Sequence, residues 1–367
     1  IVSKAKKLKV IPLGGLNEIG KNLTVFEFGK DIVILDCGIA FPDEEMLGVD
    51  LVIPDFNYLI KNAEKIRGIV VTHGHEDHIG AIPYFLKEIN VPIYATKFTL
   101  GLIKHKLKEH NLLSTAILNT VAPGDFVNLG SITAEFIRTN HSIADACAIA
   151  FHTPVGVVVH TGDFKIDTTP VTGEMIDLSR FGELGKEGVL LLMSDSTNAE
   201  RPGFTMSEST VGVSFDELFQ QHRKSRIIVA TFASNIHRVQ QVIDAASKYG
   251  RKVAVSGRSM ENILNVAIEL GYMNLPSSDI LVDIDSINKY NKEHTVIITT
   301  GSQGEPMSAL SRMAFSDHRK VEVTKDDLII ISATPIPGNE KSVSNVINEL
   351  FKIGAEVIYK SLADVHV

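Results

Sequence analysis

Metal-binding side chains are concentrated in one short segment of the sequence, Thr72-His73-Gly74-His75-Glu76-Asp77-His78. The segment directly follows an apolar run that is typical of a buried strand. Imidazole nitrogens and carboxylate oxygens are good ligands for zinc and manganese, whereas a solvated loop gains nothing from so many histidines. The spacing differs from that of the helical His-Glu-x-x-His motif. In an extended turn, His73 and His75 can point at one ion, and Asp77 and His78 can reach a second.

Two later residues complete a set of metal ligands. His141 follows the predicted strand Ser131–Thr139, and Asp163 follows the predicted strand Gly156–Thr161. Each lies at the carboxyl end of a strand, where α/β proteins assemble their sites. Taken alone, either residue would also suit an ordinary turn. Together with the first segment, they predict a hydrolase that uses two metal ions.

A second motif, Gly15–Asn22, nearly matches the phosphate-binding P-loop. Asn22 stands where that motif needs Ser or Thr, and the residues that follow it are typical of a strand instead of a helix. We therefore expect a tight turn that brings Asn22 near the metal site.

The elements that must position these residues change in character along the chain. The first half combines hairpins with strand–helix units, which predicts sheets covered by helices. The second half alternates strands with helices of 10–15 residues, which predicts βαβ units and a parallel sheet. In that half we expect strands at Ile227–Thr231, Lys252–Ser256, Ile280–Asp283, Thr295–Thr300, Leu328–Ser332 and Glu356–Tyr359, and helices at Ser234–Tyr249 (with Ser234 as the N-cap), Ser259–Leu270, Met307–Phe315 and Glu340–Ile353.

Length and composition fit such an organisation. The 367 residues, 44% of them hydrophobic, suggest two or three domains. The 36 basic and 44 acidic residues give a net charge of −8, which argues against coating nucleic acid by bulk charge but permits a local basic channel. Cys37 and Cys147 cannot form a disulfide framework, and no apolar run is long enough for a transmembrane helix. We therefore expect a soluble, cytoplasmic protein without membrane association.

The combined motifs resemble a known family. The pattern His73-x-His75-x-Asp77-His78, followed by His141 and Asp163, resembles the metallo-β-lactamase fold, and the βαβ insertion opened by Ser194–Thr197 resembles the β-CASP nucleases within that superfamily. Four later segments resemble bacterial ribonuclease J: Ala230–Asn235, Gly257–Glu261, Gly301–Pro306 and Pro335-Ile336-Pro337-Gly338-Asn339. The resemblance covers essentially the whole chain.

The resemblance implies a fold and a domain organisation. The fold class would be α/β, a metallo-β-lactamase αββα sandwich with an inserted β-CASP domain of parallel βαβ type. Residues 1–203 would form the first part of the metallo-β-lactamase domain and residues 204–355 the β-CASP domain. Residues 356–367 would return into the metallo-β-lactamase domain, and we expect the natural protein to continue into its remaining strands and a C-terminal domain.

The resemblance also implies a role for each candidate residue. His73, His75 and His141 would hold one metal ion, Asp77 and His78 the other, and Asp163 would bridge them. Asp36 and Asn22 would support the ligands without binding metal. Catalytic roles would fall to Asp77, Asp195 and His366, and substrate-binding roles to Ser234, Asn235, Ser302, Gly304 and His366. His366 matches the start of a phosphate-gripping segment, His-x-Ser-Gly-His, whose second histidine, together with a last metal ligand, we expect beyond Val367.

The implied function is a metal-dependent ribonuclease of mRNA decay and rRNA maturation. It would hydrolyse RNA phosphodiesters to 5′-phosphate products, as a 5′→3′ exonuclease and an endonuclease. Zn²⁺ suits the histidine-rich site best, and Mn²⁺ or Mg²⁺ could support turnover. Expected partners are RNA, a second copy in a homodimer or homotetramer, a paralogous subunit and other RNA-decay factors. Two alternatives are a catalytically weak RNA-binding paralogue and a hydrolase of a small thioester, lactone or β-lactam.

Overall fold

The protein folds into two compact units. The computed structural model describes residues 7–42, 46–336 and 338–367, so that Pro337 of the motif quoted above lies outside the described residues. The first unit runs to Ile166 and resumes at Met175–Gly203, and the second comprises Asp167–Glu174 and Phe204–Val367. Within the described residues, no helix is long and apolar enough to cross a membrane.

The first unit is built on two sheets. The first sheet has the order β1-β2-β3-β4-β5-β6, with strands at Leu8–Gly14, Leu23–Phe28, Asp31–Leu35, Ile66–Val70, Ile93–Thr96 and Leu118–Val121. The second sheet has the order β11-β10-β9-β8-β7, with β7 at Phe126–Leu129, β8 at Ile132–Arg138, β9 at Cys147–Thr153, β10 at Gly156–His160 and β11 at Val189–Met193. The tight turn between β2 and β3 uses Gly29 with a φ of 66°, a conformation that glycine adopts without strain.

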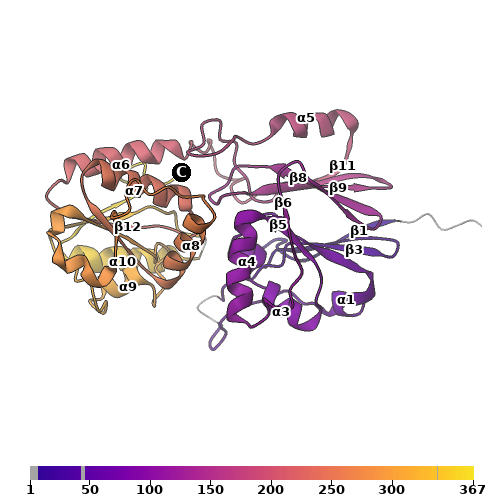
Figure 1. Cartoon of the computed structure of the whole chain (residues 1–367), viewed down its shortest axis with the longest axis horizontal. Helices are drawn as coiled ribbons and strands as arrows, with labels where there is room; N and C mark the ends of the chain where they lie inside the picture. The colour runs from indigo at the N-terminus through magenta and orange to yellow at the C-terminus, as the bar shows by residue number, and fades with distance from the viewer. Residues whose placement is uncertain (1–6, 43–45, 337) are drawn as a thin grey trace, which may run out of the picture. The chain divides into compact units, whose positions relative to one another are not determined.

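The two sheets pack face to face between layers of helices. Apolar side chains of both sheets, among them Phe26, Val70, Phe136 and Phe151, form one buried core. Outside the first sheet lie α1 (Asn57–Ile60), α3 (Ile82–Glu88) and α4 (Lys97–Glu109), and outside the second lies α5 (Leu178–Glu187) (Figure 1). Leu184 anchors α5 on the second sheet. The layers therefore follow the order αββα.

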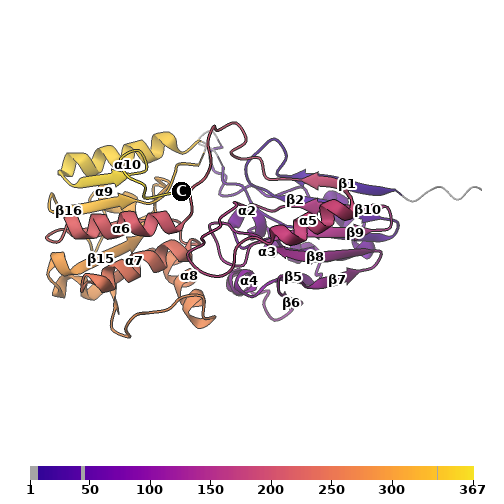
Figure 2. The same cartoon turned by 90° about the horizontal axis from the view of Figure 1, so that it is seen from above.

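The second unit contains a single parallel sheet of order β14-β13-β15-β12-β16-β17. Its strands, from β12 to β17, are Arg226–Ala230, Lys252–Ser256, Leu281–Val282, Thr295–Thr299, Asp327–Ile331 and Glu356–Tyr359. The helices are α6 (Ser209–Gln221), α7 (Ile236–Lys248), α8 (Arg258–Glu269), α9 (Ala309–Ala314) and α10 (Glu340–Ile353). Helices α6 and α7 lie over one face of the sheet, while α9 and α10 pack on the other (Figure 1, Figure 2). The short 3₁₀ helices are Ala63–Lys65, Ile284–Lys289 and Lys292–His294.

Residues 356–367 differ from the prediction. They were expected to return to the first domain, but β17 is the last strand of the second unit's sheet and pairs in parallel with β16. The sequence reading also missed α5, β11 and α6, which lie between the two regions where strands were most evident. The end of the histidine-rich segment and the residues after it form two short helices, α2 (Glu76–Ile79) and α3.

Candidate metal centre

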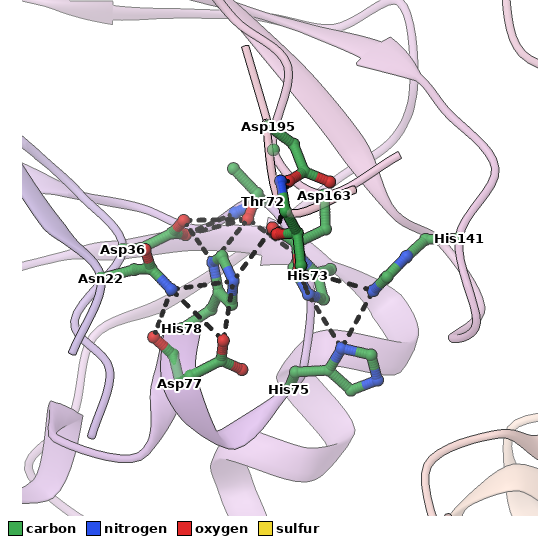
Figure 3. A network of polar contacts seen from close by, with 12 residues as sticks. Asn22, Asp36, Thr72, His73, His75, Asp77, His78, His141, Asp163 and Asp195 are labelled. Carbon is green, nitrogen blue, oxygen red and sulfur yellow. Dashed lines mark hydrogen bonds and ion pairs between the residues drawn. The ribbon is translucent and has the colours of Figure 1, made fainter. Parts of the chain in front are cut away.

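Six of the predicted ligands meet in the first unit as two overlapping sets (Figure 3). The first set is His73, His75, His141 and Asp163, and the second is Asp77, His78 and Asp163. Within each set, the nitrogen or carboxylate oxygen atoms lie within 4.8 Å of one another. Asp163 belongs to both sets, which is the position that the family resemblance implied for a bridging ligand.

In the first set, three imidazole nitrogens converge. His75 Nδ1 lies 3.0 Å from His73 Nε2 and 3.1 Å from His141 Nε2. Asp163 Oδ2 lies 4.0 Å from His73 Nε2 and 3.7 Å from His141 Nε2. The three histidines and the carboxylate thus aim their acceptor atoms at one common point.

The second set is centred on His78. Its Nε2 lies 3.4 Å from Asp163 Oδ1 and 3.5 Å from Asp77 Oδ2. On the other side of the ring, Nδ1 lies 2.8 Å from Asp36 Oδ2. Because Asp36 can only accept, His78 Nδ1 carries a proton, so that a metal ion would bind at Nε2, which faces Asp77 and Asp163.

Thr72 is a functional residue that the sequence reading missed. Its hydroxyl donates to Asp36 Oδ2 at 2.9 Å and lies 3.0 Å from His73 Nδ1. Since that hydroxyl proton goes to the carboxylate, its oxygen accepts from His73 Nδ1–H, which leaves the His73 Nε2 lone pair for the first set. The signal was available, because Thr72 directly precedes the first histidine.

The turn formed by residues 73–78, which carries four of the candidate ligands, is held by backbone hydrogen bonds. Helix α2 begins directly after His75, and the neighbouring segments bond to its carbonyls: Asn22 N–H to Asp77 O at 3.0 Å and Cys37 N–H to His78 O at 2.8 Å. A Cβ atom added to Gly38 would lie 1.6 Å from Asp77 O, so only glycine permits this approach. Asn22 also donates from Nδ2 to Asp77 O at 3.1 Å, as expected of a turn near the ligands.

The electrostatics favour neutral histidines in the first set. Burial and the neighbouring His141 lower the pKa of His75 to about 3. Burial, together with His78, holds the pKa of His73 well below its ordinary value. His78 behaves oppositely: burial alone would lower its pKa, but Asp77, Asp163 and Asp36 hold it well above the ordinary value. Three acids around one buried imidazole thus form a strongly negative pocket.

The residues present fit divalent metal ions. Ligand bonds of about 2.1 Å in tetrahedral geometry place ligand atoms roughly 3.4 Å apart. The separations of 3.0 Å to 4.0 Å in the first set bracket that value. Nitrogen and oxygen donors also match the preferences of zinc and manganese. A cation within each set would offset the repulsion between acceptor atoms that lie this close together.

Asp195 lies outside both ligand sets, although Figure 3 draws it with the network. Its backbone N–H donates to Thr161 Oγ1 at 3.0 Å. Its Oδ1 accepts from Thr197 N–H at 2.9 Å and from the Thr197 hydroxyl at 2.7 Å. These bonds fix the carboxylate just after β11, in the same unit as the ligands.

The predicted substrate-binding residues all belong to the second unit. They follow the carboxyl ends of parallel strands of one sheet: Ser234 and Asn235 after β12, Ser302 and Gly304 after β15, and His366 after β17. The predicted N-cap is wrong, because Asn235 caps α7 by accepting from Arg238 N–H. Asn235 and Ser302 are 1% and 3% exposed.

Comparisons with known proteins agree with this architecture. The model of the metallo-β-lactamase superfamily matches residues 17–174, and the model of the ribonuclease J β-CASP domain matches residues 224–350. These matches confirm the predicted fold class. A crystal structure of a protein of unknown function from Enterococcus faecalis superposes with a TM-score of 0.71 at 15% identity, covering 99% of this chain and 88% of the other, which shows the fold alone.

Curated relatives are similar over nearly the whole chain. Ribonuclease J of Synechocystis is 48% identical over 100% of this chain, and that of Thermus thermophilus is 47% identical over 98%. Ribonuclease J2 of Bacillus subtilis is 42% identical over 96%. The chain spans 57%, 63% and 63% of the lengths of these three relatives.

Proposed function

We propose that this chain, which belongs to the ribonuclease J family of metallo-β-lactamase and β-CASP nucleases, acts as a metal-dependent ribonuclease. It would hydrolyse RNA phosphodiester bonds and leave 5′-phosphate products. The observation that carries the proposal is the pair of ligand sets joined by Asp163. Two adjacent cation positions are typical of enzymes that clamp both sides of a phosphoryl transfer.

Each ligand set has a distinct role in the proposed reaction. His73, His75 and His141 would hold one ion, Asp77 and His78 the other, with Asp163 shared. When bound, such ions neutralise phosphate oxygens and make water more acidic. Zn²⁺ is our first candidate because of the histidines, with Mn²⁺ or Mg²⁺ supporting turnover.

The surrounding residues would orient these groups and move protons. Asp36 holds His78 by Nδ1, and Asn22 Nδ2 contacts Asp77 Oδ2 at 3.3 Å, so the two ligands that belong to the second set alone are both restrained. Asp195 would accept a proton at Oδ2, because its Oδ1 is engaged by Thr197. Asp77 would also orient the attacking water.

The second unit would bind the RNA strand. Its predicted contact residues, Ser234, Asn235, Ser302, Gly304 and His366, collect at the carboxyl edge of a parallel sheet, where α/β proteins bind ligands. Backbone N–H groups at the start of α7 suit a phosphate. By this proposal the enzyme combines 5′→3′ exonuclease and endonuclease action in mRNA decay and rRNA maturation, in the cytoplasm. It would act as a homodimer or homotetramer, with a paralogous subunit and other RNA-decay factors as possible partners.

Two alternatives make different predictions. A hydrolase of small thioesters or lactones needs no second domain, whereas this chain devotes most of residues 204–367 to one. A catalytically weak RNA-binding paralogue would tolerate the loss of ligands, whereas all six predicted ligands are present and lie together. The ribonuclease proposal is therefore the one the geometry supports best.

The test is cleavage of 5′-monophosphorylated RNA with Mn²⁺, comparing the wild type with a His75→Ala variant. A His105→Ala variant serves as the control, because His105 lies on α4 and pairs with Glu109 on the surface. We expect hydrolysis by the wild type and by the control, and none by His75→Ala. An inactive wild type, or an equally active His75→Ala variant, would refute the proposal, and a thioester substrate tests the first alternative.

A further inference from the structure

Arg238 is a fully buried arginine in the first turn of α7, with 0% of its surface exposed. Its Nε donates to Glu208 Oε1 at 2.6 Å, and Nη2 pairs with the same carboxylate. Glu208 is itself buried and stands at the N-cap position of α6. A buried ion pair of this kind is weak evidence for stability, because desolvation offsets most of its attraction. The geometry of the ion pair is therefore more informative than its contribution to stability.

The other terminal nitrogen of the guanidinium, Nη1, contacts the segment that follows β17. Nη1 donates to Ser332 Oγ at 2.6 Å and Val365 O at 3.2 Å, and it lies 3.2 Å from His366 Nδ1. The Ser332 hydroxyl in turn donates to Val365 O at 2.5 Å. Arg238 thus joins α6, the carboxyl end of β16 and the segment that follows β17.

This contact determines which nitrogen of His366 carries its proton. An arginine can only donate, so His366 Nδ1 must accept. The ring is then held with its proton on Nε2, where it can serve as a donor to an anionic oxygen. The first turn of α7 is linked to the same arrangement, because the backbone N–H of Arg238 donates to Asn235 Oδ1 at 3.1 Å.

We propose that Arg238, supported by Glu208 and Ser332, is a positioning residue for RNA phosphate binding, because its guanidinium holds His366 beside the first turn of α7 and presents His366 as an Nε2–H donor. The inference rests on the proposed ribonuclease function. Arg238 itself touches no substrate, since it is fully buried. Lysine cannot replace it, because an ammonium group lacks the planar fork that reaches Glu208 and His366 together.

A second buried arginine provides a matched control. Arg226, at the start of β12, is 2% exposed and donates to Asp327 Oδ1 at 2.9 Å and Oδ2 at 2.7 Å. It lies at the amino end of the strand, opposite to the edge where the substrate residues collect. An Arg226→Lys variant therefore carries a similar structural loss without disturbing His366.

The experiment compares Arg238→Lys, Ser332→Ala and Arg226→Lys in the full chain, with 5′-monophosphorylated RNA and Mn²⁺. We expect Arg238→Lys to raise KM about tenfold with kcat within about twofold, and Ser332→Ala to raise KM less. Arg226→Lys should lower thermal stability and leave KM unchanged. Long-range ¹H–¹⁵N spectra of the His366 ring, assigned with a His366→Gln variant, should show only the Nε2–H tautomer in the wild type and a mixture in Arg238→Lys.

The outcomes separate this inference from the proposed function. An unchanged KM in a folded Arg238→Lys variant overturns the inference, as does an equal rise in KM in Arg226→Lys. If the wild type hydrolyses no RNA, the ribonuclease proposal fails. The tautomer comparison then decides the positioning role by itself: an unchanged His366 ring in Arg238→Lys overturns it, and a shifted one supports it.

Discussion

Replacing Asp36 with asparagine is expected to weaken metal binding selectively at the second ligand set. Asp36 is 2% exposed and accepts three kinds of hydrogen bond: from Thr72 N–H at 2.8 Å, from the Thr72 hydroxyl and from His78 Nδ1–H at 2.8 Å. Asparagine keeps the shape of this side chain but turns one acceptor into a donor. Either orientation of the amide then sets a donor against a donor.

The conflict transfers to the metal-binding nitrogen. If the amide nitrogen faces His78, its Nδ1 must accept, which places the ring proton on Nε2, the atom aimed at Asp77 and Asp163. Loss of such a supporting carboxylate costs about 10- to 100-fold in metal affinity. That range corresponds to about 1.4–2.8 kcal/mol. The first set should change less, because its histidines do not contact Asp36 directly.

The assay is calorimetric titration of the metal-free protein with Zn²⁺ and Mn²⁺. Asp31→Asn is the matched control. Asp31 is also a buried acid of the first unit, but its hydrogen bonds come from Arg67 and Ser131 instead of from residues of the metal site. We expect the wild type and Asp31→Asn to bind two equivalents, and Asp36→Asn to retain one tight equivalent. Two equivalents of wild-type affinity in Asp36→Asn would show that this reasoning is wrong.

Three further measurements test other parts of the site. His78 has a raised pKa but must bind metal as a neutral ring, so metal binding to the second set near pH 7 should release about one proton, whereas His75, with a pKa of about 3, should release none. Calorimetric titration in two buffers of different ionisation enthalpy would measure the number of protons released. Zero release would contradict the assignment of His78 as a ligand. Gly38→Ala should lower the free energy of unfolding, measured with denaturant, by more than about 3 kcal/mol, because the added Cβ would meet Asp77 O. Gly182→Ala, which has open space around it in α5, should leave that free energy unchanged or raise it. Equal effects of the two substitutions would contradict the close approach at Gly38. Chelation should lower the unfolding free energy by about 2.7 kcal/mol for each ion bound, relative to a metal concentration 100-fold above Kd, and an unchanged melting temperature would argue against a metal in the folded state.

The clustering of the candidate ligands was predictable because these residues are local in sequence or follow strand ends. Four of them fall between His73 and His78, and sheet topology brings the ends of β8 and β10 to the same place. The structure brings all six candidate ligands together in two groups. Thr72 was harder to recognise, because a threonine at the end of a strand is also an ordinary strand residue.

Residues that act through distant partners could not be predicted in this way. The role of Arg238 depends on Glu208, Ser332 and Val365, which are separated from it by 30, 94 and 127 positions. Local pattern instead suggested a helix that begins with Ser234 as its cap. The true cap, Asn235, is identified only when its side chain is seen to accept from Arg238 N–H.

The misplaced segment 356–367 shows a different kind of error. Glu356–Tyr359 follows α10, which in turn follows β16, and a strand that returns in parallel beside the previous one through a helix is the most common outcome of such an order. Connectivity alone therefore favoured the second unit, and β17 does pair with β16 there. The family-based boundary overrode this physical rule. The same pairing carries Val365 and His366 to Arg238, so that these residues are positioned by the sheet whose strands precede the other predicted RNA contacts.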